Sequence, residues 1–208
     1  ENIPYYESGA RISHTSNDEK WFMSLLILSG WQRIKPVDGN TLPSFGTQIT
    51  YSPSSRITFN SSTFIGTDSP NQRRLMRYFH DFYSTFKLSS KLAATIGFDI
   101  GMEQKSKGSS TFNTWFNSTA IMRYTPTTNT AIAVRGEYFD DRNSVLLSST
   151  SPNGFRTWAF SANFDWNITK NFLWRVEARS LINKDNIFTR QDGTCLLYTS
   201  DAADEEDS

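Results

Sequence analysis

Charged side chains occupy alternate positions in several segments of the sequence, and their types and spacing suggest a chemical role. Arg175, Glu177 and Arg179 are each separated by one residue, as are Arg135 and Glu137. In a β-strand, alternate residues point to the same face. Charges gathered on one face of a sheet create an electric field along it, and rings of such charges determine which solutes pass through a pore.

The same alternation, extended along the chain, predicts one set of charged residues on a shared polar face. We expect this set to line a water-filled lumen and to act on passing solutes through charge. Its members are Arg77, Asp81, Lys87, Asp99, Glu103, Arg123, Arg135, Glu137, Asp165, Arg175, Glu177 and Arg179. A ladder of salt bridges that fills a narrow barrel is an equally weighted alternative, because small barrels pack their interiors with side chains.

The sequence lacks the patterns of catalytic and metal sites. His14 and His80 each stand alone, without a second His or Cys at metal-ligand spacing. The segment Asp140 to Asn143 lacks the glycine and the terminal glutamate of a calcium loop. Neither a phosphate-binding glycine loop nor a serine-hydrolase elbow occurs. Carboxylates of the polar set could pair for acid–base catalysis, but basic neighbours favour charge balance. The sequence therefore predicts no enzyme, no metal and no cofactor.

Composition narrows the class of protein further. The 208 residues carry 21 basic and 21 acidic side chains, so no net charge draws the chain to nucleic acid. The mean hydropathy is −0.50, and no apolar run approaches the length of a membrane-spanning helix. Aromatic residues make up 14% of the chain, and Ser, Thr, Asn and Gly are abundant. This mixture favours strands, including those of membrane barrels, which alternate apolar and polar residues.

The two ends of the sequence lead to separate expectations. The chain begins at Glu1 without a signal peptide, which we expect either was removed or lies outside this sequence. From Cys195 to Glu205 it reads CLLYTSDAADE, which resembles a translated sequencing adapter. We therefore assign residues 1–194 to a partial outer-membrane barrel and expect residues 195–208 to be a non-native, disordered tail. Without that tail the chain has no cysteine, and hence no disulfide or thiol nucleophile.

Turn-forming residues divide the chain into about ten strands. Short turns such as Tyr51-Ser-Pro-Ser-Ser-Arg-Ile57 alternate with longer polar connections such as Asp140 to Asn153. Most strands exceed the usual globular strand of about 5 to 6 residues and suit the crossing of a bilayer. They are predicted at Tyr5 to Thr15, Lys20 to Ile34, Phe45 to Ser52, Arg56 to Gly66, Leu75 to Leu88, Lys91 to Glu103, Phe112 to Tyr124, Thr130 to Phe139, Gly154 to Asn167 and Phe172 to Asn183.

The face opposite the charges is predicted to be apolar. Between Lys91 and Glu103, every residue on this face is apolar, and no Lys, Arg, Asp or Glu falls within its span in any predicted strand. Only His80 and, near a strand end, His14 are titratable there. Aromatic residues near its ends are expected to form the girdles of a membrane barrel. They are Trp21, Trp31, Tyr51, Phe86, Tyr124, Tyr138, Trp158, Trp166 and Trp174.

Two architectures share this alternation of faces. A soluble β-sandwich also has one apolar and one polar face per strand, with the apolar face against a second sheet. Strand length, the alternation of short and long connections and the aromatic ends all favour a membrane barrel. We therefore predict an all-β, antiparallel, up-and-down transmembrane β-barrel that is incomplete within this chain.

Six blocks of sequence, in this order, follow the pattern of a known family. They are Gly30-Trp-Gln-Arg-Ile-Lys35, Phe45-Gly-Thr-Gln-Ile-Thr-Tyr51, Ser62-Thr-Phe-Ile-Gly-Thr-Asp68, Gly97-Phe-Asp-Ile-Gly-Met-Glu-Gln-Lys105, Arg135-Gly-Glu-Tyr-Phe139 and Leu173-Trp-Arg-Val-Glu-Ala-Arg179. Together they resemble the OmpL-like outer-membrane β-barrel porin family over about residues 5–190. The resemblance implies a porin-like barrel in the outer membrane of a Gram-negative bacterium. The chain departs from the family by lacking its final strands and terminal aromatic residue, so we expect the barrel not to close within this chain.

These observations lead to three functional hypotheses. The first is passive diffusion of small hydrophilic solutes through the lumen, with membrane lipid and those solutes as partners. The second is a non-conducting outer-membrane barrel that serves structure or adhesion through its long loops. The third is a soluble β-sandwich that acts as a binding module.

Overall fold

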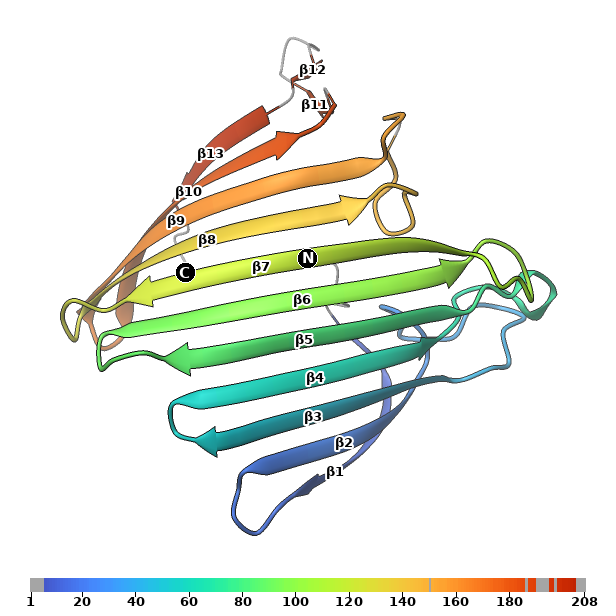
Figure 1. Ribbon diagram of the computed structural model, residues 1–208, viewed down its shortest axis with the longest axis horizontal. Coiled ribbons are helices and arrows are strands. Elements are labelled where there is room, and N and C mark those ends of the chain that lie inside the picture. Colours follow the sequence, from blue (N-terminus) through green and yellow to red (C-terminus); the bar gives the residue numbers. More distant parts are fainter. Residues whose placement is uncertain (1–5, 150, 186, 190–194, 197, 205–208) are drawn as a thin grey trace. The chain divides into compact units, whose positions relative to one another are not determined.

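The computed structural model describes residues 6–149, 151–185, 187–189, 195–196 and 198–204 (Figure 1). Among these residues the only helical element is a short 3-10 turn, η1 (Asn71–Arg73), and none is long and apolar enough to cross a membrane. The strands are β1 (Gly9–Thr15), β2 (Trp21–Leu28), β3 (Ser44–Ser54), β4 (Ile57–Gly66), β5 (Arg77–Lys87), β6 (Leu92–Gln104), β7 (Phe112–Tyr124), β8 (Thr130–Asp141), β9 (Phe155–Thr169), β10 (Phe172–Asn183), β11 (Phe188–Thr189), β12 (Cys195–Leu196) and β13 (Tyr198–Asp204).

Eleven strands form one sheet, in which β1 to β10 follow chain order and β13 lies beside β10 (Figure 1). The hairpins β1–β2, β2–β3, β3–β4, β8–β9 and β9–β10 are antiparallel; in β8 and β9, for example, Val134 lies opposite Ala162. The predicted all-β, up-and-down arrangement is therefore confirmed. The strand order starts at β1 and stops at β13, so the sheet formed by the described residues is not closed.

The chain divides into two compact units, which we describe separately. Unit 1 comprises Glu1–Ser84 and Gly97–Phe116, and unit 2 comprises Thr85–Ile96 and Asn117–Ser208. Unit 1 contains the hairpins from β1 to β4, with parts of β5, β6 and β7. Unit 2 contains β8, β9, β10 and β13, with the remaining parts of β5, β6 and β7.

Short turns and long loops alternate along the chain. The strands are joined by short turns at residues 16–20, 55–56, 88–91, 125–129 and 170–171, and by longer loops at residues 29–43, 67–76, 105–111 and 142–154. In the first turn, the Ser16 hydroxyl donates to Asp18 at 2.6 Å and accepts the backbone N–H of Trp21 at 3.0 Å. The hydrogen bond from Ser16 lowers the pKa of the Asp18 carboxyl. Serine and aspartate thus close this turn without a glycine.

The predicted boundaries agree with most strands to within one or two residues but are wrong for the first two. The first strand was predicted from Tyr5, yet β1 begins at Gly9. Phe112 to Tyr124 and Phe172 to Asn183 agree with β7 and β10 residue for residue. The second strand was predicted to reach Ile34, yet β2 ends at Leu28. Gly30 has φ of 137° and Gln32 has φ of 53°, and both values take the backbone out of the extended region. The chain therefore leaves the sheet before Trp31.

Burial on the two faces is the reverse of that in a water-soluble protein. In unit 1, Leu25 is 62% exposed, whereas Asn60 is 2% exposed. In unit 2, Trp158 is 51% exposed, whereas Asp165 is 7% exposed. A β-sandwich would cover these apolar side chains with a second sheet, so this burial pattern argues against that architecture. Apolar surface exposed on this scale requires an apolar environment.

One segment that we expected to be disordered forms a strand instead. Tyr198–Asp204, within the predicted non-native tail, is β13 and pairs antiparallel with Val176 to Ile182 of β10. An edge strand presents unpaired N–H and C=O groups that accept another extended segment, which accounts for this pairing. The remainder of the predicted tail lies outside the described residues, apart from Cys195–Leu196 in β12. The non-native origin of this tail stays a prediction.

Candidate functional site

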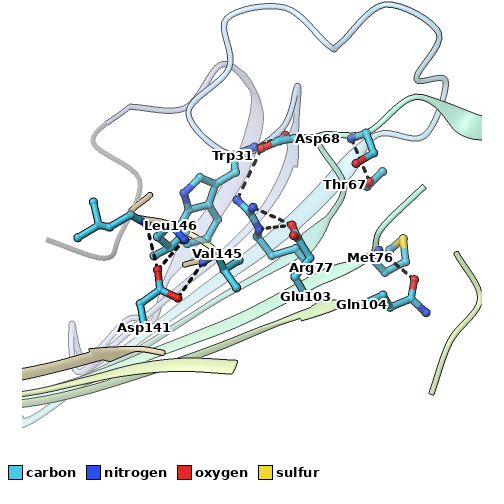
Figure 2. Close-up of polar contacts among 12 residues, drawn as sticks. Trp31, Thr67, Asp68, Met76, Arg77, Glu103, Gln104, Asp141, Val145 and Leu146 are labelled. Atoms are coloured by element: carbon cyan, nitrogen blue, oxygen red, sulfur yellow. Dashed lines mark hydrogen bonds and ion pairs between the residues drawn. The ribbon is translucent and has the colours of Figure 1, made fainter. Parts of the chain in front are cut away.

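The polar face of unit 1 holds a cationic side chain between aromatic rings and carboxylates. Arg77, the first residue of β5, donates to Glu103 Oε2 from Nε at 3.1 Å and from Nη2 at 2.7 Å (Figure 2). Its Nη1 lies 3.7 Å from Asp68 Oδ2. The guanidinium carbon lies 5.4 Å from the ring centroid of Trp31 and 5.7 Å from that of Trp115, within the range of cation–π attraction. We call these five residues the Arg77 cluster.

Trp31 reaches this cluster because the chain turns sharply after β2. The backbone N–H of Trp31 donates to Asp68 Oδ1 at 3.0 Å (Figure 2). The φ of 137° at Gly30 favours glycine, and a side chain there would meet the same carboxylate oxygen at 2.5 Å and displace Asp68 from its bond to Trp31. The Trp31 ring packs edge-on against Phe64 and Phe79, with centroids 5.1 and 4.9 Å away.

The position of Trp31 corrects one of the sequence predictions. We expected Trp31 in an interfacial girdle, but its side chain is only 7% exposed and lies inside the Arg77 cluster. The prediction placed Trp31 on the apolar face because the second strand was expected to extend to Ile34. Since β2 ends at Leu28, that parity no longer applies at Trp31.

The second tryptophan of the cluster depends on a glycine in the neighbouring strand. Trp115, in β7, is completely buried. A Cβ atom on Gly101, in β6, would lie 2.0 Å from the Trp115 ring, so only a residue without a side chain leaves room for that ring. Gly101 thus allows the indole to lie against the backbone of β6.

Two long loops of unit 1 are held to each other beside the cluster. Asn40 donates its side-chain amide to the carbonyl of Thr67 at 2.9 Å, and the backbone N–H of Asn71 donates to the carbonyl of Gly39 at 2.9 Å. The Asn71 side chain also donates to Thr41 Oγ1 at 3.0 Å. These bonds fix the loops at residues 29–43 and 67–76, which carry Trp31 and Asp68.

A polar network lies on the same face of unit 1. Asn60 is almost fully buried; its carbonyl accepts from Gln48 at 3.1 Å and from Thr50 at 3.0 Å. Its amide donates to Asp81 Oδ2 at 3.4 Å, and the Asp81 carboxyl lies within hydrogen-bonding range of Asp99. A cavity of about 190 Å³ adjoins the network, and its lining combines polar residues such as Gln48 and Asp81 with apolar ones such as Leu26 and Phe64.

The polar face of unit 2 carries ion pairs instead of an aromatic cluster. Arg175 binds Asp165 through two hydrogen bonds, from Nε at 2.7 Å and Nη2 at 3.0 Å, and the two residues lie opposite each other in β10 and β9. Arg135 pairs with Glu137 along β8. Arg175 holds the carboxylate of Asp165 in the geometry that favours a strong, charge-assisted pair.

The remaining predicted polar residues differ in how they are engaged. Arg179 Nε lies 3.9 Å from Glu177 Oε1, and both side chains are well exposed, so this pair is weak. Lys87 and Arg123 are exposed near the short turns, and Arg123 acts on Asp165 through its charge. Of the twelve residues predicted to line the lumen, eight therefore form four ion pairs. Asp81 and Asp99 interact with each other. Their role in lining a lumen stays a prediction.

Comparison with known proteins identifies the class of this sheet. Residues 1–202 match the family described as "Putative beta-barrel porin-2, OmpL-like". The chain belongs to this family. The resemblance inferred from the six sequence blocks is therefore confirmed.

A solved structure shares the fold of this chain. No curated protein matches the chain. A similar solved structure is described as "NanC porin structure in rhombohedral crystal form". It shares 12% identity, covers 94% of this chain and 92% of its own, and has a TM-score of 0.50. At this identity the likeness concerns the fold alone.

The other predicted girdle residues lie near strand ends. In unit 1, Trp21 and Tyr51 stack with ring centroids 4.1 Å apart. In unit 2, the side chains range from half-buried to exposed: Phe86, Tyr124, Tyr138, Trp158, Trp166 and Trp174. Their contact with membrane interfaces stays a prediction, consistent with their placement.

Two charged residues of unit 2 lie on the apolar face, contrary to the sequence prediction. Strand β8 continues to Asp141, beyond the predicted end at Phe139, so Asp140 shares a face with Tyr138. Arg156 of β9 lies opposite Asp140 and alternates with the exposed Trp158. The Asp140 carboxylate accepts from Arg156 Nε at 3.0 Å. The alternation of residues along the sequence already placed Arg156 on the apolar face, but it did not show that Asp140 would lie opposite it.

Proposed function

We propose that this chain is part of an outer-membrane porin that gives small hydrophilic solutes passive diffusion across the outer membrane of a Gram-negative bacterium. One observation carries the proposal: each unit has an exposed apolar face back to back with a face of buried polar and charged side chains. A barrel wall between lipid and water needs this arrangement, since lipid excludes charge and a lumen accepts it. Membrane lipid and the passing solutes are the partners, and no chemical step is required of the protein.

The first test is electrical. Full-length protein carrying this chain, purified in detergent and inserted into a planar bilayer, should produce discrete conductance steps. The physical reason is that a lumen lined by ion pairs and exposed arginines holds water and mobile ions. Insertion is checked in parallel by flotation with vesicles and by heat-modifiable migration in gels. Inserted protein that stays electrically silent would contradict the pore.

The charges of unit 2 make a prediction about ion selectivity. Replacing both Arg175 and Arg179 with Glu should shift the reversal potential in a salt gradient toward cation preference. The change removes two cations from the polar face of β10 and adds two anions next to Asp165 and Glu177. Lys170→Glu, in the turn between β9 and β10, changes charge outside the strands and is the matched control. Equal reversal potentials in all three proteins would remove these arginines from the conduction path.

A second candidate function rests on the ion pairs themselves. The Arg77 cluster joins one guanidinium to two carboxylates and two indole rings, and such a cluster fills space on the polar face. A barrel filled in this way would serve structure, or adhesion through its long loops, without conduction. Silence in the bilayer together with correct insertion would favour this candidate.

A further inference from the structure

The loop-side ends of β8, β9 and β10 carry a charged group on the apolar face of unit 2. Asp140 is 1% exposed, and its carboxylate accepts from Arg142 Nη2 at 2.9 Å and from Arg156 Nε at 3.0 Å. Tyr138 adds a hydroxyl donor to the same carboxylate at 3.3 Å. One buried anion therefore organises two arginines on the face that otherwise presents Trp158 and Ile182.

A pocket of about 330 Å³ opens beside these residues. Tyr138, Arg156, Trp158, Ile182 and Lys184 line it, together with Asn183. The backbone N–H of Lys184 donates to the carbonyl of Arg156 at 3.3 Å, which brings the two basic residues side by side. Trp158 and Ile182 are 51% and 44% exposed, so the pocket joins a cationic rim to an apolar surface.

Two further carboxylates, Asp141 and Asp185, lie near this rim. Asp141 lies on the opposite face of β8 and accepts the backbone N–H groups of Val145 and Leu146, each at 2.8 Å (Figure 2). Asp185, next to Lys184, accepts from the Ser151 hydroxyl and the Asn153 amide, and the Ser151 bond lowers its pKa. Loop donors thus hold both carboxylates, and Asp185 also interacts with Lys184 through its charge.

These groups leave one cation in excess, because three basic residues face the two carboxylates of Asp140 and Asp185. Arg142 and Arg156 pair with Asp140, Lys184 lies beside Arg156, and the Arg142 side chain is 53% exposed. Basic residues near a membrane interface attract anionic headgroups, and arginine and tyrosine suit the oxygens of a phosphate. Trp158 and Ile182, which line the same pocket, would lie against the first carbons of the acyl chains.

We infer that this pocket binds the phosphate monoester headgroup of a membrane lipid. Arg156 and Lys184 supply hydrogen-bond donors and positive charge to that group, and Trp158 and Ile182 bind the attached hydrocarbon. The inference rests on the membrane location in the proposed function, but not on conduction. A protein that inserts without conducting would leave it intact.

The test measures lipid retention by full-length protein in non-ionic detergent, using native mass spectrometry. The probes are phosphatidic acid, phosphatidylcholine and diacylglycerol of identical acyl chains. Wild-type protein should retain phosphatidic acid in preference to the other two. Arg156→Gln with Lys184→Gln should weaken that retention about 25-fold, and Lys184→Gln alone about fivefold, since each cation near the surface contributes a similar increment.

Two controls keep the result interpretable. Lys170→Gln removes a cation from the short turn at the other end of the β9–β10 hairpin and should retain phosphatidic acid like wild type. Lys184→Gln leaves the bonds of Arg142 and Arg156 to Asp140 in place. A loss of lipid retention in this variant therefore cannot result from a broken ion pair at Asp140. Heat-modifiable migration verifies the fold of every variant.

Three outcomes would overturn the inference. The first is equal retention of phosphatidic acid by wild type and the double variant. The second is equal retention of diacylglycerol and phosphatidic acid by wild type. The third is displacement of phosphatidic acid by inorganic phosphate at equal concentration, which would indicate a site for soluble anions.

Discussion

Replacing Arg77 with alanine should destabilise the folded protein by about 3 kcal/mol, because the change leaves buried carboxylates without their cation. The Arg77 side chain is 11% exposed, and its partners Glu103 and Asp68 are 19% and 18% exposed. The same substitution removes the guanidinium that lies over Trp31 and Trp115. Urea-induced unfolding of vesicle-inserted protein, followed by tryptophan fluorescence, measures the loss.

A matched variant separates this effect from the general loss of an arginine. Arg179→Ala breaks a pair whose closest atoms are 3.9 Å apart and whose side chains are 40% and 37% exposed. An exposed pair contributes about 0 to 1 kcal/mol, so Arg179→Ala should unfold close to the wild-type urea concentration. Equal destabilisation by the two substitutions would contradict a special role for the Arg77 cluster.

The faces of the strands could be read from the sequence because alternation is a local property. In β6, every second residue from Leu92 to Met102 is apolar, and the opposite face carries Asp99. A strand places successive side chains on opposite faces whatever its neighbours are. Since all hairpins repeat this rule, strand type and face assignment needed no tertiary information.

The Arg77 cluster could not be read in the same way, because its geometry is set by residues far apart in sequence. Trp31 lies in it through a hydrogen bond to Asp68, and Trp115 through the missing side chain of Gly101. The only local signals were Gly30 before Trp31 and a glycine inside a strand. Such glycines indicate a turn or a close approach of another group to the backbone, but they do not show which residue approaches.

Ion-pair partners depend on register, which the turns set. Parity put Arg175 and Asp165 on one face, but their pairing across β9 and β10 follows from the hairpin register, including a shift between Phe172 and Leu173. Boundaries matter in the same way at Asp140, where an extension of β8 beyond Phe139 adds a charge to the apolar face. A boundary error of this size therefore changes the chemistry assigned to a face.

Replacing Val134 with arginine should cost about 2 to 4 kcal/mol of folding free energy in a lipid bilayer, whereas Ala133→Arg should be tolerated. The two positions are neighbours in β8 and point to opposite faces: Val134 is 49% exposed among apolar side chains, and Ala133 lies opposite Asn163 on the polar face. Folding into phospholipid vesicles over a urea series, scored by heat-modifiable migration, gives both free energies.

The pair of variants distinguishes lipid from water against the exposed face. In water, an arginine at a half-exposed position changes stability by little, so Val134→Arg would behave like a surface substitution. Against hydrocarbon, the same guanidinium loses its hydration and has no partner, so folding is penalised. A tolerated Val134→Arg together with a damaging Ala133→Arg would reverse the assignment of the faces, and the pore would then have no polar lining.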